Sequence, residues 1–161
     1  MTATGDELAG VVDLFGALTR EELSQALTEL AFKQGAAVDD AAVTDAIETA
    51  ITDYVLVEYK PEGGDANSES LLTVGPAAFP TLPPNAEDLP HILDYEKRAV
   101  DRDRLAEQVQ TRLKAEAHEA VAADDADRAA VLLDVSYDLE AWATVETDAI
   151  RASLSATLPQ D

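Results

Sequence analysis

Apolar residues recur with helical spacing in three successive stretches near the start of the chain. Positions i, i+3, i+4 and i+7 share one face of a helix, so each stretch predicts an amphipathic helix. The first covers residues 6–17 and the third covers 40–53. The second lies between Thr19, which forms a capping-box pattern with Glu22, and Gly35, a residue type that commonly follows the end of a helix.

Beyond the third helix, which Asp39 or Asp40 can cap, the pattern changes from a helical period to alternation. In the stretch VLVEY, Val55, Val57 and Tyr59 share one face, as the side chains of a β-strand do. A polar, glycine-containing loop follows, and the apolar stretch LLTV supplies a return strand. The sequence therefore predicts a small β-hairpin after three helices.

The hairpin is followed by a proline-rich segment, GPAAFPTLPPNAEDLP, which holds five of the seven prolines in the chain. Proline fixes φ and lacks a backbone N–H, so this segment is neither a regular helix nor a central strand. We interpret it as an ordered connector that ends the first unit. The predicted units are residues 1–82 and 83–161.

After the connector the pattern is helical to the end of the chain. One helix is predicted from about Asp88 to residue 122. A last helical region is predicted over 126–157, with a kink near Thr144–Thr147, where β-branched residues lower the helix propensity. The predicted fold class is mainly α with a small β-hairpin, in which a helical extension follows the first unit.

The composition indicates a folded protein with a strongly acidic surface. Hydrophobic residues make up 47% of the chain, which is enough for a core, and the formal net charge is −22. Many carboxylates and few lysines favour a protein adapted to a high-salt cytoplasm, where a Debye length of about 3 Å at 1 M salt screens self-repulsion. The alternative is that the acidity serves a specific basic partner.

Several classes of site are excluded or unsupported by the residues present. The chain has no cysteine, so it forms no disulfide and has no thiol nucleophile. No P-loop, GxGxxG or GxSxG motif occurs, and the two histidines, His91 and His118, belong to no metal-binding pattern. We expect no enzyme activity, no cofactor and no metal site. Without a signal peptide or a long apolar segment, we also expect a cytoplasmic protein that does not enter a membrane.

The order helix, helix, helix, strand, loop, strand resembles the winged-helix domain. ALTREELSQAL is similar to the start of the second helix in many archaeal winged-helix regulators, and AVTDAIETAITDYVLVEY is similar to the third helix running into the first wing strand. The likeness covers about residues 6–80. The whole chain also resembles small acidic haloarchaeal proteins of unknown function. The resemblance implies a winged-helix-like unit, followed by an extension that packs on it or mediates dimerisation.

In winged-helix proteins the third helix enters the major groove of DNA, which would place the reading face on the exposed side of residues 40–53. The residues of that side are Asp40, Ala41, Thr44, Asp45, Glu48, Thr49 and Thr52. The stretch 39–53 contains five acidic residues and no Lys or Arg, whereas DNA affinity depends largely on basic residues. We therefore predict a non-enzymatic module that binds proteins through this face and the wing, in a regulatory or transcription-related setting.

The alternative is a DNA-binding regulator that uses a different, basic surface. Residues 97–114 hold six of the eleven basic residues: Lys97, Arg98, Arg102, Arg104, Arg112 and Lys114. On one continuous helix, Lys97, Arg104 and Arg112 would fall within a sector of about 80°. Such a surface would contact nucleic acid or an acidic partner. The competing interpretation is a solvated helix with ion pairs between neighbouring turns.

Two aromatic residues are candidates for contacts with a protein. Tyr59 lies at the end of the first predicted strand, and Trp142 lies on the apolar stripe of the last helical region. Tryptophan is enriched at interface hot spots, although a place on an apolar stripe also fits a core residue. The apolar faces of the C-terminal helices must be buried, either within the chain or in a homodimer. We therefore expect the partner to be a second copy or another protein.

Overall fold

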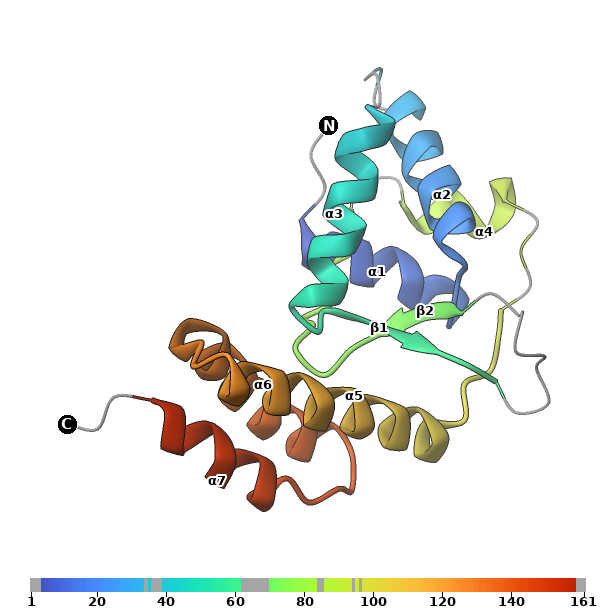
Figure 1. Cartoon of the computed structure of the whole chain (residues 1–161). Helices are drawn as coiled ribbons and strands as arrows, with labels where there is room; N and C mark the ends of the chain where they lie inside the picture. The colour runs from blue at the N-terminus through green and yellow to red at the C-terminus, as the bar shows by residue number, and fades with distance from the viewer. Residues whose placement is uncertain are drawn as a thin grey trace. The chain divides into compact units, whose positions relative to one another are not determined.

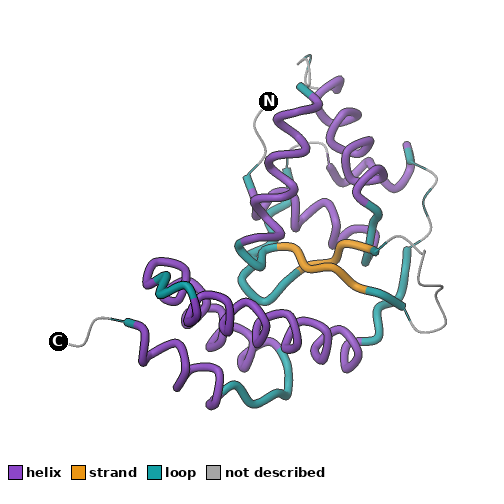
Figure 2. Tube along the Cα trace, viewed as in Figure 1, coloured by secondary structure: helices purple, strands orange, loops and turns teal. Residues whose placement is uncertain are grey.

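The computed structural model describes residues 4–33, 35, 39–61, 70–83, 86–93, 95 and 97–158, and these residues are mainly helical with a two-stranded hairpin (Figure 1 and Figure 2). The predicted fold class is confirmed. The chain divides into two compact units, Met1–Val100 and Asp101–Asp161. We refer to them as the N-terminal unit and the C-terminal unit and describe each by itself.

The N-terminal unit places three helices on one side of a hairpin (Figure 1). Its elements are α1 (Gly5–Phe15), α2 (Arg20–Lys33), α3 (Asp40–Thr52), β1 (Leu56–Tyr59), β2 (Leu71–Val74), the 3₁₀ turn η1 (Ala86–Asp88) and α4 (Leu89–Ile92). The strands are antiparallel, and Leu56 is opposite Val74 in the register. Leu18, between α1 and α2, adds one bridge to the hairpin through hydrogen bonds to Leu72 in both directions.

The helix ends follow the signals in the sequence. The predicted capping box before α2 is present, because the hydroxyl of Thr19 accepts from the N–H of Glu22 at 3.1 Å and the Glu22 carboxylate accepts from the N–H of Thr19 at 2.9 Å. Asp39 caps α3 by accepting from the N–H of Ala41. Gly35 follows α2 with φ of 72°, the left-handed conformation in which glycine carries no steric penalty.

The core of the N-terminal unit extends beyond the proline-rich segment. The buried residues that follow the prolines and pack into the same core as α1–α3 are Ala86, Leu89 and Leu93. The backbone N–H of Arg98 also donates to the carbonyl of Phe15 at 2.8 Å. The unit therefore ends near Val100 rather than at residue 82. The prolines mark irregular backbone, but the apolar residues after them complete the core.

The single helix predicted across residues 88–122 is wrong. α4 ends at Ile92, and α5 (Arg102–Ala122) begins after residues 97–101, which are not helical. Asp101 caps α5, and the N–H of Arg98 is already bonded to another part of the N-terminal unit. These local and tertiary hydrogen bonds override the helix propensity of the stretch between the two helices.

The C-terminal unit consists of three helices that pack against one another. They are α5, α6 (Ala126–Trp142) and α7 (Asp148–Thr157). Its fully buried leucines are Leu105, Leu113, Leu132, Leu139 and Leu154. The kink predicted near Thr144–Thr147 is a complete break between α6 and α7. At this break the buried Thr147 donates its backbone N–H to Glu140 at 2.9 Å.

None of the helices in the described ranges combines the length and the apolar character needed to cross a lipid bilayer.

Candidate functional site

The solvent-facing side of α3 is acidic. Its buried residues, Ile47, Ala50 and Ile51, fix which side of the helix points outward. The exposed residues on the opposite side are Asp40, Ala41, Thr44, Asp45, Glu48, Thr49 and Thr52. The face that the winged-helix resemblance predicted as the reading face is thus exposed, and its charged groups are carboxylates.

A shallow groove of about 420 Å³ lies between the start of α1 and α3. Each charged residue that lines it in the described part of the chain is an aspartate: Asp6, Asp45 and Asp53. We call this feature the acidic groove. The Asp6 side chain is also held in place by the proline-rich segment, because its Oδ1 accepts a hydrogen bond from the backbone N–H of Phe79 at 3.1 Å. The sequence did not reveal that Asp6 would meet α3, since the two are distant in the chain.

Arg20 reaches the α3 face but is bound there by two carboxylates. Its Nε lies 2.9 Å from Glu48 Oε1, and its Nη2 lies 2.6 Å from Glu58 Oε1. Hydrogen bonding to Glu58, more than any other effect, raises the pKa of Arg20. Exposed pairs of this kind contribute little to stability, about 0–1 kcal/mol each. They do link α2, α3 and β1, and they engage the guanidinium with protein carboxylates.

The predicted wing contains the candidate contact residue Tyr59. Tyr59 is 4% exposed, and the alternation along β1 places it on the opposite face of the hairpin from Leu56, which packs in the core with α1–α3. The middle of the loop between β1 and β2, residues 62–69, lies outside the described residues.

The predicted basic surface over residues 97–114 is divided between the two units. Lys97 is exposed at the end of the N-terminal unit. Its neighbour Arg98 is turned toward its own unit, where Nη1 lies 2.6 Å from Glu22 Oε1 and donates to the carbonyl of Ala17 at 3.0 Å. Hydrogen bonding to Glu22 raises the pKa of Arg98. Because α5 begins only at Arg102, the prediction that Lys97 shares one helix sector with the later arginines is wrong.

The remaining candidates lie on α5, and Arg102 and Arg112 have partners within the C-terminal unit. The guanidinium of Arg102 lies 4.8 Å from the ring centroid of Trp142, a cation–π contact. Trp142, the last residue of α6, is partly exposed, and its contact with Arg102 lies within its own unit. Arg112 pairs with Glu116 at 2.7 Å, and Arg104 is half-buried with an interaction of its own. These contacts fit the interpretation of a helix with local ion pairs.

These features define a mainly helical protein with an acidic groove on its N-terminal unit. A second concavity of that unit, about 620 Å³, is lined by charges of both signs, Glu22, Lys97 and Arg98. A family model matches residues 6–159, and so spans both units. The chain belongs to this family, DUF7109, a family of unknown function. No curated protein and no solved structure matches the chain.

Proposed function

We propose that this protein is a non-enzymatic binding module that contacts another protein, and that the acidic groove receives a Lys or Arg side chain of that partner. The observation that carries the proposal is the lining of the groove, where each charged residue described is an aspartate. Three carboxylates around one concavity attract a cationic group and repel a phosphate. A side chain held between α1 and α3 would also contact the exposed threonines of α3.

The regulatory or transcription-related setting rests on a winged-helix-like N-terminal unit. The order α1, α2, α3, β1, β2 supports this assignment. The bridge between Leu18 and Leu72 also supports it, because it widens the hairpin into a small sheet on which the helices pack. In this proposal the helix that reads DNA in winged-helix proteins has become a surface for protein contact.

Direct DNA binding is the alternative, and the electrostatics of the N-terminal unit oppose it. α3 carries no basic residue, and Arg20 and Arg98 are both bound to carboxylates of the protein. High salt screens the repulsion between these carboxylates and phosphates but supplies no attraction.

The setting that we propose is a cytoplasm of high salt concentration, because the net charge of −22 destabilises a compact chain in dilute buffer. Thermal unfolding followed by circular dichroism in 0.1–3 M KCl tests this. We expect the midpoint to rise steeply up to about 1 M, where the Debye length reaches about 3 Å. A midpoint that does not change with KCl contradicts the high-salt setting.

Photo-cross-linking tests the acidic groove directly. A photoreactive amino acid replaces Thr49, which lines the groove, and in a control variant it replaces Thr111, an exposed threonine of α5. We expect adducts with a protein from position 49 and none from position 111. Replacing both Asp45 and Asp53 with Asn should reduce the yield from position 49.

The charge control is the double replacement of Asp127 and Asp134 with Asn, since both are exposed on α6 and the net charge changes equally. The proposal is wrong if both double variants reduce the yield equally or if position 49 gives no protein adduct.

Fluorescence anisotropy with duplex DNA over 0.5–3 M KCl tests the alternative function, direct DNA binding, and light scattering tests whether the protein is a homodimer. Binding that is lost when Lys97, Arg104 and Arg112 are all replaced with Ala would favour the DNA-binding regulator.

A further inference from the structure

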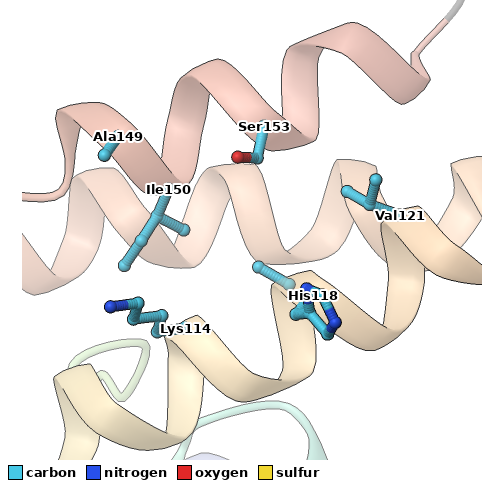
Figure 3. A pocket seen from close by; sticks show the side chains of 7 residues that line it. Lys114, His118, Val121, Ala149, Ile150 and Ser153 are labelled. Carbon is cyan, nitrogen blue, oxygen red and sulfur yellow. The ribbon is translucent and has the colours of Figure 1, made fainter.

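A second concavity lies within the C-terminal unit, between α5 and α7. It has a volume of about 200 Å³, and we call it the α5–α7 pocket. Its lining residues are Lys114, Ala117, His118 and Val121 from α5, and Ala149, Ile150 and Ser153 from α7. Figure 3 shows side chains from the two helices facing the space between them. The pocket is therefore formed by two packed helices and not by a loop.

The polar groups of the pocket are placed by helix periodicity. Lys114 and His118 are four residues apart on α5, so they lie one turn apart on the same side of the helix. Ser153 faces them from α7 (Figure 3). An ammonium group, an imidazole N–H and a hydroxyl are all hydrogen-bond donors. The Lys114 nitrogen points toward the Ile150 end of the pocket, away from His118 and Ser153 (Figure 3). All three polar side chains are exposed, so they lie along the rim of the pocket.

Lys114 differs from the arginines around it. Arg112, Arg128 and Arg151 each form an ion pair with a carboxylate of the C-terminal unit. No ion pair of Lys114 is found in the described part of the chain, although the sequence contains 33 acidic residues. Within the described ranges, its ammonium group therefore lies at the pocket without a carboxylate at ion-pair distance.

Two neighbouring carboxylates are already neutralised by arginines. Glu116 is bound by both Arg112 and Arg128, and Asp148 is bound by Arg151. These pairs weaken the repulsion that an anion would otherwise meet near the pocket. Glu119, next to His118, is exposed and adds negative charge at that end of the pocket, so an anion is better placed at the Lys114 end.

The rest of the lining is aliphatic. Ala117 and Ile150 are 3% and 8% exposed, and Val121 and Ala149 complete the wall. The volume equals the share of liquid that about seven water molecules occupy. It is smaller than the sites of drug-sized ligands, which begin at about 300 Å³. The pocket thus has room for a short aliphatic chain with one polar end.

We propose that the α5–α7 pocket binds a small organic anion, a short-chain aliphatic carboxylate. Its carboxylate accepts a hydrogen bond from Lys114, and its chain lies against Ala117 and Ile150. A charge-assisted hydrogen bond supplies orientation, and removal of the chain from water supplies the remaining affinity. The site is in a different unit from the acidic groove, so it goes beyond the proposed function and does not depend on it.

NMR titration of the isotope-labelled full chain in 2 M KCl tests this. The probes are sodium butyrate, sodium acetate, which lacks most of the chain, and 1-butanol, which lacks the charge. We expect saturable shifts of signals from α5 and α7 with butyrate. Acetate and 1-butanol should each bind at least about fivefold more weakly, because each lacks one of the two contributions. If acetate binds as tightly as butyrate, the pocket makes only a surface contact with the anion. If 1-butanol binds as tightly as butyrate, the pocket makes only an apolar contact. Either result overturns the proposal.

Two variants and one control locate the site. Lys114→Gln should weaken butyrate binding at least about fivefold, because it removes the charge but keeps a long side chain. Ser153→Leu should abolish the shifts by filling the pocket, and its amide spectrum shows whether the unit is still folded. Lys97→Gln, the same change in the N-terminal unit, should leave binding unchanged. Absence of saturable shifts in the original chain, or equal effects of Lys114→Gln and Lys97→Gln, overturns the proposal.

Discussion

Arg98 and Glu22 are separated by 76 positions in the chain and form a two-point ion pair. Arg98 Nη1 lies 2.6 Å from Glu22 Oε1, and Nη2 lies 3.1 Å from Oε2. The same carboxylate accepts the backbone N–H of Thr19 at the start of α2. One side chain thus caps a helix and also fixes the last segment of the N-terminal unit.

Replacing Arg98 with Ala should destabilise the N-terminal unit by about 1–3 kcal/mol, because a partly buried carboxylate loses its charged partner and Ala17 loses a donor. Arg98→Lys should recover only part of this, since an ammonium group cannot form both bonds of the fork. Urea unfolding followed by NMR signals of the N-terminal unit provides the measurement.

Lys97→Ala is the matched control for the arginine variants, because Lys97 is the adjacent basic residue and is exposed. Its effect should stay within about 0.5 kcal/mol. Equal losses in the two alanine variants would show that general charge, and not the fork with Glu22, stabilises this segment.

The pH dependence of stability should reveal the same ion pair. Hydrogen bonding to Arg98, more than any other effect, lowers the pKa of Glu22 below its ordinary value of 4.5. The stabilisation is therefore complete above that pH and is lost as the pH falls through the lower pKa of the folded state. Glu22→Gln keeps an oxygen that can accept the N–H of Thr19, so it removes the charge but preserves the helix cap.

We expect the original chain to be more stable than Glu22→Gln at pH 6–7, and the difference to shrink as the pH falls below 4.5. Comparing the two chains at each pH cancels most of the titration of the other carboxylates. A difference that stays constant from pH 7 to pH 3 would contradict the assignment of this stabilisation to the charged form of Glu22.

The sequence predicts elements well where the signals are local. The capping residues Thr19 and Asp39 and the alternation before the hairpin each depend on neighbours within a few positions. The capping box between Thr4 and Glu7 carries a similar signal, a threonine followed three residues later by a glutamate, and that pattern can be found in the sequence. Local patterns thus specify the order of the elements.

The errors arise where distant parts of the chain meet. Residues 97–101, before α5, contain no strong helix breaker, and their non-helical backbone is fixed by Asp101 and by the contact of Arg98 with the α1–α2 turn. Gly16 permits this contact, because at φ of 80° a Cβ would lie 2.1 Å from the Arg98 carbonyl oxygen. The acidic face of α3 follows from periodicity, but the meeting of Asp6 with α3 in one groove does not. Tertiary geometry therefore decides which charged residues form a site.

Replacing Gly10 with Ala should destabilise the N-terminal unit, although helix propensity alone predicts a gain of about 1 kcal/mol. A Cβ at Gly10 would lie 2.2 Å from the carbonyl oxygen of Thr81. That carbonyl cannot easily withdraw, because the N–H of Thr81 donates to the Asp6 carbonyl at 2.9 Å. We expect a net loss of about 1–3 kcal/mol in urea unfolding, as in overpacked cores.

Gly5→Ala in the same helix is the control for Gly10→Ala. A Cβ at Gly5 would meet Val55 Cγ1 at 3.5 Å, an ordinary van der Waals distance. This variant should be neutral or slightly stabilising. If Gly10→Ala were equally well tolerated, the contact between α1 and the proline-rich segment would not be as close in solution.

Replacing Thr147 with Val should destabilise the C-terminal unit by about 1–2 kcal/mol. The Thr147 hydroxyl is buried at the break between α6 and α7, where it donates to the Ser136 carbonyl at 3.3 Å and accepts from Arg151. Valine has a similar shape but no hydroxyl, so both polar partners lose a hydrogen bond inside the protein. Trp142 is the only tryptophan of the chain and belongs to this unit, so its fluorescence in urea reports the unfolding.

Thr144→Val tests whether the hydroxyl of Thr147 or the β-branched shape matters at this break. Thr144 lies in the same connection and is exposed, so its replacement should change the free energy of unfolding by less than about 0.5 kcal/mol. Both substitutions exchange one β-branched residue for another and therefore alter backbone preference equally. A loss confined to Thr147→Val would assign the break between the helices to a buried polar contact. Equal losses at both positions would show that the effect does not depend on the buried hydrogen bonds of Thr147.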